Sequence, residues 1–554
     1  MSLQFITGNS GNGKTKYLFN RIVKEAKANP RDNYLVIVPE QFTMQTQRQL
    51  VDLSENKAIM NIDVLSFKRL AYRVFDELGI TNLTVLEETG KNLVLRKLAA
   101  QEADKLGVIG RNLNRIGYIS EVKSLLSELV QYNISPEELG RYIASGRLSD
   151  TLSDKLKDVL VLYEAFEKFM QDKYITAEEI LNVLSNVAEE SAILRNSVIA
   201  FDEFTGFTPI QNQLIKKLFV ISKKIYVTLT IDCREDIFKS RGMQELFDMP
   251  KRTVKSLTEM AAFYGIEVEE PIILDKNYRL AENEELSFME QQLFRKRRCS
   301  FKKAPKHIHI DCLRDPKQEL TKIARRINEL VRNENLRYRD IAIVTGDVNI
   351  YAGYVREIFD KYNIPYFIDA TQEILFHPFI EFIRSIPDIA AQNFSADAVF
   401  RFLRCGFSEL LDSEIDVLEN YVLACGVRGK SAWDKKWVRL PKHKAGYDLE
   451  LLNQSREYIM ELLKPVYQVF SDKKSTVKDY VLAIYKLIVL LDIPDKLAKK
   501  EQALLDAGDQ TASKEYGQIY KIVMQLFEKY VAVLGDECMD AEEFTQILDA
   551  GLDA

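Results

Sequence analysis

The sequence lacks most of the features that mark a specialised class of protein. Its 554 residues include six cysteines, and no two of these have the C-x2-C spacing of a zinc or iron–sulfur ligand pair. The longest apolar runs are far too short to span a bilayer, and the first residues lead directly into a strand pattern without a signal peptide. The formal net charge of −6 argues against a wholly basic nucleic-acid coat but leaves room for a local basic groove. We therefore expect a cytoplasmic bacterial-type protein with reduced thiols and no membrane partner.

The composition that is present is typical of a large globular protein. Hydrophobic residues make up 46% and charged residues 29% of the chain, and the length predicts about three to five domains. Continuous β-branched runs predict strands at residues 3–7, 34–38, 197–201 and 225–230. Such runs are typical of a parallel sheet that helices cover on both faces.

Two further patterns complete the predicted organisation. Apolar residues at helical spacing predict an all-helical segment at 85–190, between the second and third strands. A second α/β pattern begins near residue 281, with strands at 308–313, 341–344 and 366–368 and helices at 317–332 and 351–362. From about residue 385 the sequence is almost entirely helical, and it includes an amphipathic stretch at 541–548. We therefore predict an α/β protein with two cores, each interrupted by a helical block.

The stretch GNSGNGKT, directly after the first predicted strand, has the pattern GxxxxGK[ST] of a phosphate-binding loop. A helix is predicted immediately after it, which is the context that this motif requires. In such loops backbone N–H groups and the helix N-terminus bind phosphate, the lysine contacts the β- and γ-phosphates, and the hydroxyl is a Mg2+ ligand. A Gly-rich turn without function is the alternative. The predicted site for ATP and Mg2+ consists of Gly8, Asn9, Ser10, Gly11, Asn12, Gly13, Lys14 and Thr15.

Two acidic residues, Asp202 and Glu203, follow the strand predicted at 197–201. At this position beside the phosphate loop, Asp202 is expected to hold Mg2+ together with Thr15. Glu203 is then placed to polarise the attacking water and is the predicted catalytic carboxylate. An ordinary solvated pair that caps the strand is the alternative.

Several boxes resemble those of the UvrD-like superfamily 1 helicases. Residues 202–211 (DEFTGFTPIQ) are similar to their D-E-F-Q-D box, residues 277–279 (NYR) to their N-Y-R motif, and residues 339–343 (RDIAI) and 363–366 (NIPY) to their second core domain. The resemblance implies that Arg279 acts in catalysis, by contacting the γ-phosphate across the domain cleft. It also implies two RecA-like P-loop core domains, each with a helical insertion. The expected division is a first RecA-like domain at 1–84 and 191–280, its helical insertion at 85–190, the start of a second RecA-like domain at 281–384, and a helical insertion of that domain at 385–554.

Three further stretches resemble the AddB family, which forms one half of the bacterial AddAB helicase–nucleases. They are VPEQFT at 38–43, LSFKRLA at 65–71 and LENYVL at 418–423, and the resemblance extends at intervals over the whole chain. It implies a subunit that resects DNA double-strand breaks for homologous recombination together with an AddA-like partner, binds single- and double-stranded DNA, and recognises Chi. AddB-like subunits also have a C-terminal nuclease domain with a 4Fe-4S cluster. Neither that domain nor its cysteines is in the sequence, so we expect an N-terminal fragment that is truncated at the C-terminus.

The departures from the helicase pattern leave the activity open. Thr205 and Gly206 replace the Gln-Asp of the acidic box, residues 231–234 (IDCR) stand where a G-D-x-x-Q box is expected, and the adenine-contacting Gln before the first strand is absent. Those residues couple ATP hydrolysis to DNA movement in the motors of the superfamily. Besides an active AddB-like subunit, two alternatives therefore remain: a catalytically silent scaffold that reads DNA, and an independent superfamily 1 helicase.

The segments after the second strand line the single-strand channel in superfamily 1 helicases. By that resemblance the expected DNA contacts are Gln41, Thr43, Phe67, Arg69, Tyr72 and Phe207. Aromatic rings can stack on bases, an amide can pair with a base edge, and a guanidinium can hold phosphate. Phe67 and Tyr72 lie on an amphipathic stretch, so a core position is the alternative for both. The basic segment at 294–307 is another possible phosphate contact, although a solvated linker is the favoured interpretation.

Overall fold

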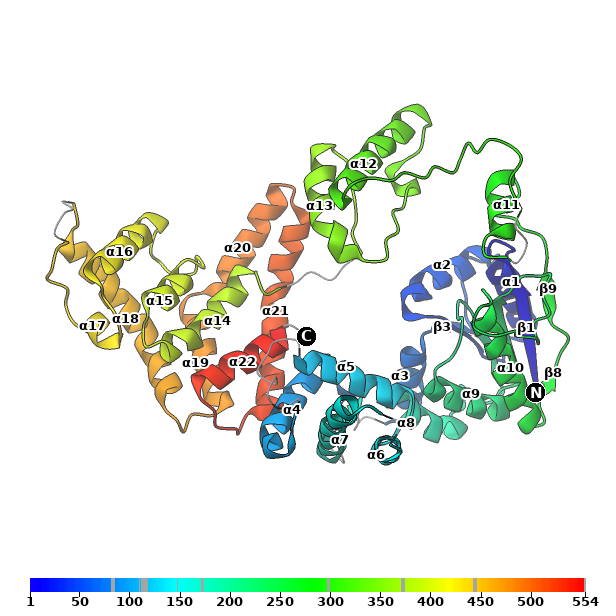
Figure 1. Ribbon diagram of the computed structural model, residues 1–554, viewed down its shortest axis with the longest axis horizontal. Helices are drawn as coiled ribbons and strands as arrows, with labels where there is room; N and C mark the ends of the chain where they lie inside the picture. The colour runs from blue at the N-terminus through cyan, green and yellow to red at the C-terminus, as the bar shows by residue number, and fades with distance from the viewer. Residues whose placement is uncertain are drawn as a thin grey trace. The chain divides into compact units, whose positions relative to one another are not determined.

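The computed structural model divides the chain into two compact units (Figure 1). The first unit consists of Met1–Asp275 and Ile374–Ala554, and the second is Lys276–Glu373. The structure describes residues 1–80, 85–108, 110, 118–146, 148–170, 174–295, 299–369, 374–441 and 446–552. None of the helices in these ranges is both long enough and apolar enough to cross a membrane.

A seven-stranded parallel sheet organises the first 275 residues. Its strands are β1 (Ser2–Gly8), β2 (Tyr34–Ile37), β3 (Ile62–Leu65), β6 (Val198–Phe201), β7 (Lys224–Thr230), β8 (Glu267–Val268) and β9 (Ile272–Leu274). The strand order is β3-β2-β6-β7-β1, and β8 and β9 both pair with β1, at its two ends. The four strands predicted for this region are confirmed as β1, β2, β6 and β7, because continuous apolar runs are what a sheet buried on both faces needs.

Helices cover both faces of this sheet. One face packs against α1 (Lys14–Ala28) and α2 (Thr43–Leu53). The other packs against α3 (Phe67–Leu78), α8 (Ile180–Val187), α9 (Pro209–Ile221) and α10 (Asp248–Phe263). Successive residues of β2 alternate between the two cores, since Val36 lies in the first and Leu35 and Ile37 lie in the second. The carboxyl ends of the central strands are therefore held rigidly between two helical layers.

A helical block is inserted between β3 and β6. It begins with β4 (Val85–Leu86) and returns through β5 (Ile175–Thr176), and these two short strands pair in parallel. Between them lie α4 (Glu88–Gln101), η2 (Ala103–Lys105), α5 (Tyr118–Gln131), α6 (Pro136–Ala144) and α7 (Asp150–Met170). These helices surround a core of their own. The short η4 (Ala188–Glu190) follows α8 and leads back to the sheet.

The C-terminal part of the first unit is entirely helical apart from isolated bridges among its described residues. Its helices are α14 (Pro378–Ala391), α15 (Ala396–Leu403), α16 (Asp412–Cys425), α17 (Lys430–Asp434), α18 (Leu449–Ser471), α19 (Val477–Leu490), α20 (Ile493–Asp506), α21 (Gln510–Leu534) and α22 (Ala541–Leu552). The helix predicted at 541–548 is confirmed as part of α22. Helix α4 packs against α21 and α22 (Figure 1). Leu93 of α4 is fully buried in the C-terminal core, and Lys97 Nζ lies 2.7 Å from Glu537 Oε1. The two helical blocks, distant in sequence, therefore share one packed interface.

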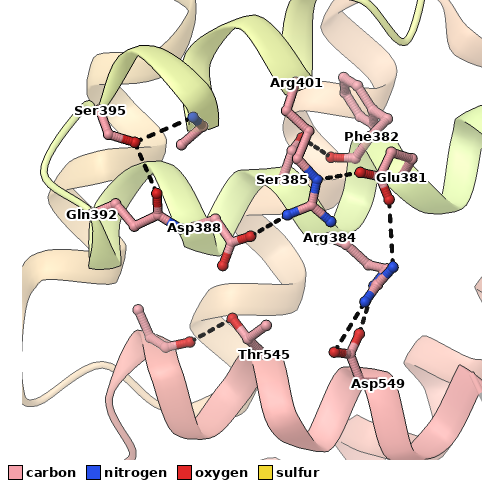
Figure 2. A network of polar contacts seen from close by, with 12 residues as sticks. Glu381, Phe382, Arg384, Ser385, Asp388, Gln392, Ser395, Arg401, Thr545 and Asp549 are labelled. Atoms are coloured by element: carbon pink, nitrogen blue, oxygen red, sulfur yellow. Dashed lines mark hydrogen bonds and ion pairs between the residues drawn. The ribbon is translucent and has the colours of Figure 1, made fainter.

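A network of charged side chains fixes α22 against α14 and α15 (Figure 2). Arg384 Nε donates to Asp549 Oδ1 at 2.6 Å, and Arg384 Nη1 lies 3.4 Å from Glu381 Oε2. Arg401 of α15 pairs with both Glu381 and Asp388 of α14. Because these side chains are partly buried, their pairing compensates for charges that would otherwise be costly to remove from water.

The second unit contains α11 (Glu284–Gln292), α12 (Pro316–Asn333), η5 (Tyr338–Asp340) and α13 (Val348–Lys361). The helices predicted at 317–332 and 351–362 are confirmed as α12 and α13, which pack around a small core. The strands predicted at 308–313, 341–344 and 366–368 are wrong, because these described segments are extended but pair with no neighbour. An apolar run becomes a strand only when a ladder partner satisfies its backbone and a covering layer buries its side chains. Here Ile310, Val344 and Phe367 are 93%, 92% and 88% exposed.

Candidate functional site

The phosphate-binding motif forms a tight loop between β1 and α1. Gly11 has a φ of 89° and Gly13 a φ of 79°, which are left-handed conformations that favour glycine. A Cβ on Gly8 would lie 2.6 Å from the carbonyl oxygen of Leu274 on the neighbouring strand β9. Gly13 is the N-cap of α1, and no side chain caps the first turn. The main chain at the start of α1 is therefore shaped to present its N–H groups to an anion.

Lys14 folds back over this loop. Its Nζ donates to the carbonyl oxygens of Gly8 at 3.1 Å and Asn9 at 3.0 Å. The side chain is only half-buried, so the ammonium lies at the rim of the loop. A phosphate oxygen held in the loop would be a stronger, charged acceptor for the same ammonium.

Thr15, Asp202 and Glu203 are brought together at the carboxyl ends of the strands. Thr15 Oγ1 lies 3.4 Å from Asp202 Oδ1 and 3.3 Å from Glu203 Oε1. Asp202 is 1% exposed, whereas Glu203 is exposed. The two carboxylates that are adjacent in sequence thus have different environments, which is the arrangement expected for two different roles.

Asp202 is a buried acid with one unpaired oxygen. Thr228 Oγ1, on the intervening strand β7, donates to Asp202 Oδ1, but Asp202 Oδ2 is buried without a hydrogen-bond partner. Burial raises the pKa of Asp202 above its ordinary value, the negative charge of Glu203 raises it further, and the Thr228 hydroxyl opposes both. A cation beside Oδ2 would relieve this cost, and a hydroxyl plus a carboxylate are hard oxygen ligands of the kind that Mg2+ takes alongside phosphate oxygens and water. The residues present therefore fit a Mg2+–nucleotide complex.

Thr228 was not anticipated from the sequence. The register pairs Phe201 with Val227, so Asp202 and Thr228 follow side by side on parallel strands. The signal was available in principle, because the hydroxyl interrupts an otherwise apolar predicted strand at its carboxyl end. Recognising it required the knowledge that β6 and β7 are neighbours.

The segment after β7 is attached to the phosphate loop. Asn9 Oδ1 accepts from the Cys233 N–H at 2.9 Å. The next-door carboxylate, Asp232, is 1% exposed and pairs with Arg234, whose Nη2 lies 2.6 Å from Oδ2. The sequence IDCR, which departs from the helicase pattern, thus provides a structural contact to the loop.

Arg279 belongs to the second unit, where its side chain is exposed. The segment that precedes it leaves the sheet at the phosphate loop, since Leu274 of β9 pairs with Gly8 and its carbonyl oxygen accepts from Asn12 Nδ2 at 2.5 Å. The strand predicted at 272–274 is thereby confirmed. Asn277 Oδ1 accepts from the Leu280 N–H and closes a turn around the NYR motif.

The six residues expected to contact DNA divide into exposed and buried groups. Gln41, Arg69 and Tyr72 are exposed, on η1 (Glu40–Phe42) and on α3. Thr43 is buried and its hydroxyl donates to the Glu40 carbonyl oxygen. Phe67 is 7% exposed and Phe207 is half-buried. The alternative of a core position therefore describes Phe67, whereas Tyr72 is open to solvent.

Four phenylalanines form a cluster at the end of β6. The ring of Phe67 lies 5.8 Å from that of Phe201, 5.6 Å from that of Phe204 and 6.3 Å from that of Phe207. The cluster forms part of the core under α3 and extends to the surface at Phe204 and Phe207.

A pocket of about 320 Å³ opens beside this cluster, at the carboxyl ends of β2, β3 and β6. It is lined by Val38, Pro39, Glu40, Ser66, Phe67, Lys68, Ala177, Ile180, Leu181, Phe204 and Gln211. The carboxyl edge of an open parallel sheet is the usual position of a ligand site in α/β proteins. The lining residues come from five separate segments, so sequence inspection could not assemble them.

The basic segment at 294–307 is described only in part. Lys296, Arg297 and Arg298 lie outside the described residues. Lys302 and Lys306 are exposed, and Lys303 pairs with Glu284. The contact with Glu284 is consistent with the interpretation as a solvated surface segment, and no phosphate-binding arrangement is formed by the described lysines.

Comparison with known proteins gives a consistent result along the chain. Residues 5–290 match the family model described as "ADDB, N-terminal". The whole chain is 38% identical over 561 residues to the AddB-type chain of the ATP-dependent helicase/deoxyribonuclease of Lachnoclostridium phytofermentans and 32% identical over 564 residues to that of Clostridium acetobutylicum. The corresponding protein of Clostridioides difficile is 31% identical over 567 residues. The chain spans about half the length of these curated relatives, namely 49%, 48% and 49%.

Proposed function

The chain belongs to the AddB N-terminal family, and from this premise we propose that it is the ATP-binding and single-stranded-DNA-binding part of a helicase–deoxyribonuclease subunit. The observation that carries the proposal is the conjunction of the glycine-shaped loop at the start of α1 with the buried, partly unpaired Asp202 opposite Thr15. A loop without function would not need an acid buried at 1% exposure beside it.

Each residue of the nucleotide site has a distinct proposed role. The N–H groups of residues 9–14 bind the phosphates, Lys14 pairs with the β- and γ-phosphate oxygens, and Thr15 and Asp202 hold the metal. Mg2+, when bound, neutralises charge on the phosphate oxygens. Glu203 is exposed at the mouth of the site, where it can accept a proton from water. Arg279 is proposed to contact the γ-phosphate, as the helicase resemblance implies, and to act on turnover rather than on binding.

The DNA-binding face is proposed to lie at the same edge of the sheet. Gln41, Arg69 and Tyr72 project from η1 and α3, which flank the pocket lined by Phe67 and Phe204. An exposed amide, a guanidinium and an aromatic ring provide hydrogen bonding to base edges, phosphate pairing and stacking, respectively. Phe67 contributes as part of the pocket wall rather than as an exposed stacking platform.

The finer features follow from the family and the names of its members. We propose that the complete subunit works with an AddA-like helicase/nuclease partner on single- and double-stranded DNA in the cytoplasm. Its task is the resection of double-strand breaks for recombination, and the face around Gln41 and Arg69 reads Chi. In the same proposal, the sheet at 1–275 is a RecA-like domain with a helical insertion, and the second unit belongs to a second such domain.

A catalytically silent scaffold is the second candidate function, because the IDCR segment after β7 serves as a structural contact to Asn9. Steady-state ATP turnover separates the candidates when it is measured with and without single-stranded DNA and with and without an AddA-like partner. DNA-stimulated turnover that Glu203→Gln removes, in the presence of a partner, supports an active subunit. Mg2+-dependent ATP binding without turnover under any condition supports the scaffold. Turnover and unwinding by the chain alone would support an independent helicase.

A further inference from the structure

Glu203 has an unusual backbone conformation. Its φ of 63° is in the left-handed region, which residues with a Cβ rarely adopt. Such a conformation persists only where the surrounding structure determines it, and it is found preferentially at functional sites. The cause must therefore be sought in the two neighbouring residues.

Both neighbours of Glu203 are held in place. Asp202 is buried and bound by the hydroxyls of Thr228 and Thr15. Phe204 is held by aromatic contacts, since its ring centroid lies 5.3 Å from that of Phe207 and 5.6 Å from that of Phe67. The single residue between these two anchors absorbs the turn of the chain. A displacement of Phe204 must therefore appear as a rotation at Glu203, because Asp202 cannot follow it.

Phe204 also forms part of the wall of the 320 Å³ pocket. The opposite wall contains Pro39 and Ile180, and polar groups of Glu40, Lys68 and Gln211 lie around it. A pocket with apolar, aromatic walls and a polar rim suits a flat heterocycle such as an unstacked nucleobase, which stacks on an aromatic ring and forms hydrogen bonds at its edge. Any molecule that fills the pocket next to Phe204 touches a side chain that is one residue away from Glu203.

We propose that Phe204 is a positioning residue that couples occupation of this pocket by a nucleobase to the placement of Glu203 beside Thr15. The inference rests on the proposed function, which supplies both ligands. Glu203 Oε1 lies 3.3 Å from Thr15 Oγ1, so a rotation at Glu203 changes the surroundings of the proposed metal–nucleotide complex. The route is short and covalent, and it runs through the acidic box rather than through the segment after β7.

Thermodynamic linkage makes the coupling measurable without turnover. If a base in the pocket changes the nucleotide affinity by some factor, then the nucleotide must change the oligonucleotide affinity by the same factor. The experiment measures the dissociation constant of a fluorescent oligothymidylate for the chain, with and without a saturating non-hydrolysable ATP analogue and Mg2+. In the wild type we expect a ratio of at least about fivefold between the two conditions.

The variant Phe204→Leu is expected to reduce this ratio to about one while the affinity for the nucleotide alone is unchanged. Phe219→Leu is the matched control, because Phe219 is 1% exposed in the same core and does not line the pocket. It should lose comparable thermal stability and keep the ratio. Phe204→Met, which retains apolar volume without a ring, replaces the leucine variant if that fails to fold.

The outcomes separate the inference from the function on which it rests. A wild-type ratio of one, or a ratio that persists in both Phe204 variants, overturns the role of Phe204 while leaving nucleotide and DNA binding intact. Absence of nucleotide binding or of oligonucleotide binding by the wild type contradicts the proposed function itself, and the inference fails with it. A ratio lost equally in Phe219→Leu shows that general loosening of the core is responsible and also overturns the inference.

Discussion

Replacing Asp202 with asparagine should make the ligand-free protein more stable. The wild-type carboxylate is 1% exposed, its Oδ2 has no hydrogen-bond partner, and burial raises its pKa. An unmade hydrogen bond of a buried polar group costs about 1–3 kcal/mol, and more when the group is charged. The amide keeps the shape and can still accept from Thr228, but it carries no charge. We therefore expect a gain of about 1–3 kcal/mol, which corresponds to about 2–4 °C per kcal/mol for a domain of 150–250 residues.

The pH dependence of this gain provides an internal control. Because the pKa of Asp202 is higher in the folded than in the unfolded chain, the folded state binds more protons between the two values. The stability of the wild type consequently falls as the pH rises from the ordinary value of 3.8 through the raised folded value, and it stays lower above it. The advantage of Asp202→Asn should thus be full at pH 8 and should shrink as the pH is lowered toward 5.

Thermal unfolding followed by scanning fluorimetry, over this pH range and without nucleotide, measures the effect. Glu203→Gln is the matched control, because this neighbouring carboxylate is exposed and its neutralisation should leave the melting temperature nearly unchanged. In titrations with ATP, Asp202→Asn should also lose the dependence of binding on Mg2+. A variant that is less stable than the wild type at pH 8, or an advantage independent of pH, would refute the assignment of Asp202 as a costly buried acid kept for a metal.

Three further predictions concern other parts of the molecule. Lys14→Ala should keep the melting temperature of the free protein, because the side chain is half-buried and packs little, but should lose the stabilisation that ATP with Mg2+ gives the wild type; equal stabilisation would contradict the role of Lys14. Gln41→Ala and Arg69→Ala should each shift the melting temperature by less than about 0.5 kcal/mol equivalent, because both are exposed, and should weaken the preference for a Chi-containing over a scrambled oligonucleotide in the complete complex; an unchanged preference would place the reading residues elsewhere. Arg384→Ala should destabilise the helical region by about 1–3 kcal/mol, because it leaves Asp549 buried without its partner (Figure 2), as measured by denaturant unfolding of that variant beside Lys302→Ala, an exposed control.

Sequence patterns predicted those parts of the fold that are determined locally. The phosphate loop, its strand and α1 follow from glycine spacing between an apolar run and a helical period, and all three are found where expected. Buried strands such as β6 and β7 were predicted because continuous apolar runs have few other uses.

The same rule was wrong in the second unit. The run at 341–344 has the composition of a strand, yet Val344 is 92% exposed and forms no ladder. Strand formation depends on a partner that is remote in sequence, and a single segment carries no information about whether that partner is present.

The candidate site was predictable residue by residue but not as an assembly. Asp202 and Glu203 were identified as a pair, whereas the hydroxyl of Thr228 could be recognised only once β6 and β7 were known to be neighbours. The burial of Phe67 and the pocket beside Phe204 depend on five segments that come together in the folded chain. Helical periodicity alone assigned Phe67 and Tyr72 the same two alternatives, and only tertiary packing distinguishes them.

Nucleotide binding is tested most directly by calorimetric titration of ATP into the chain, in Mg2+ and again in EDTA. One site per chain is expected in Mg2+, with an affinity at least about tenfold weaker in EDTA, because Thr15 and Asp202 contribute to binding mainly through the metal. A single site with the same affinity in both buffers would contradict the assignment of these two residues. The absence of binding heat in both buffers, together with no displacement of a fluorescent ATP analogue, would contradict the central proposal that this loop holds a nucleotide.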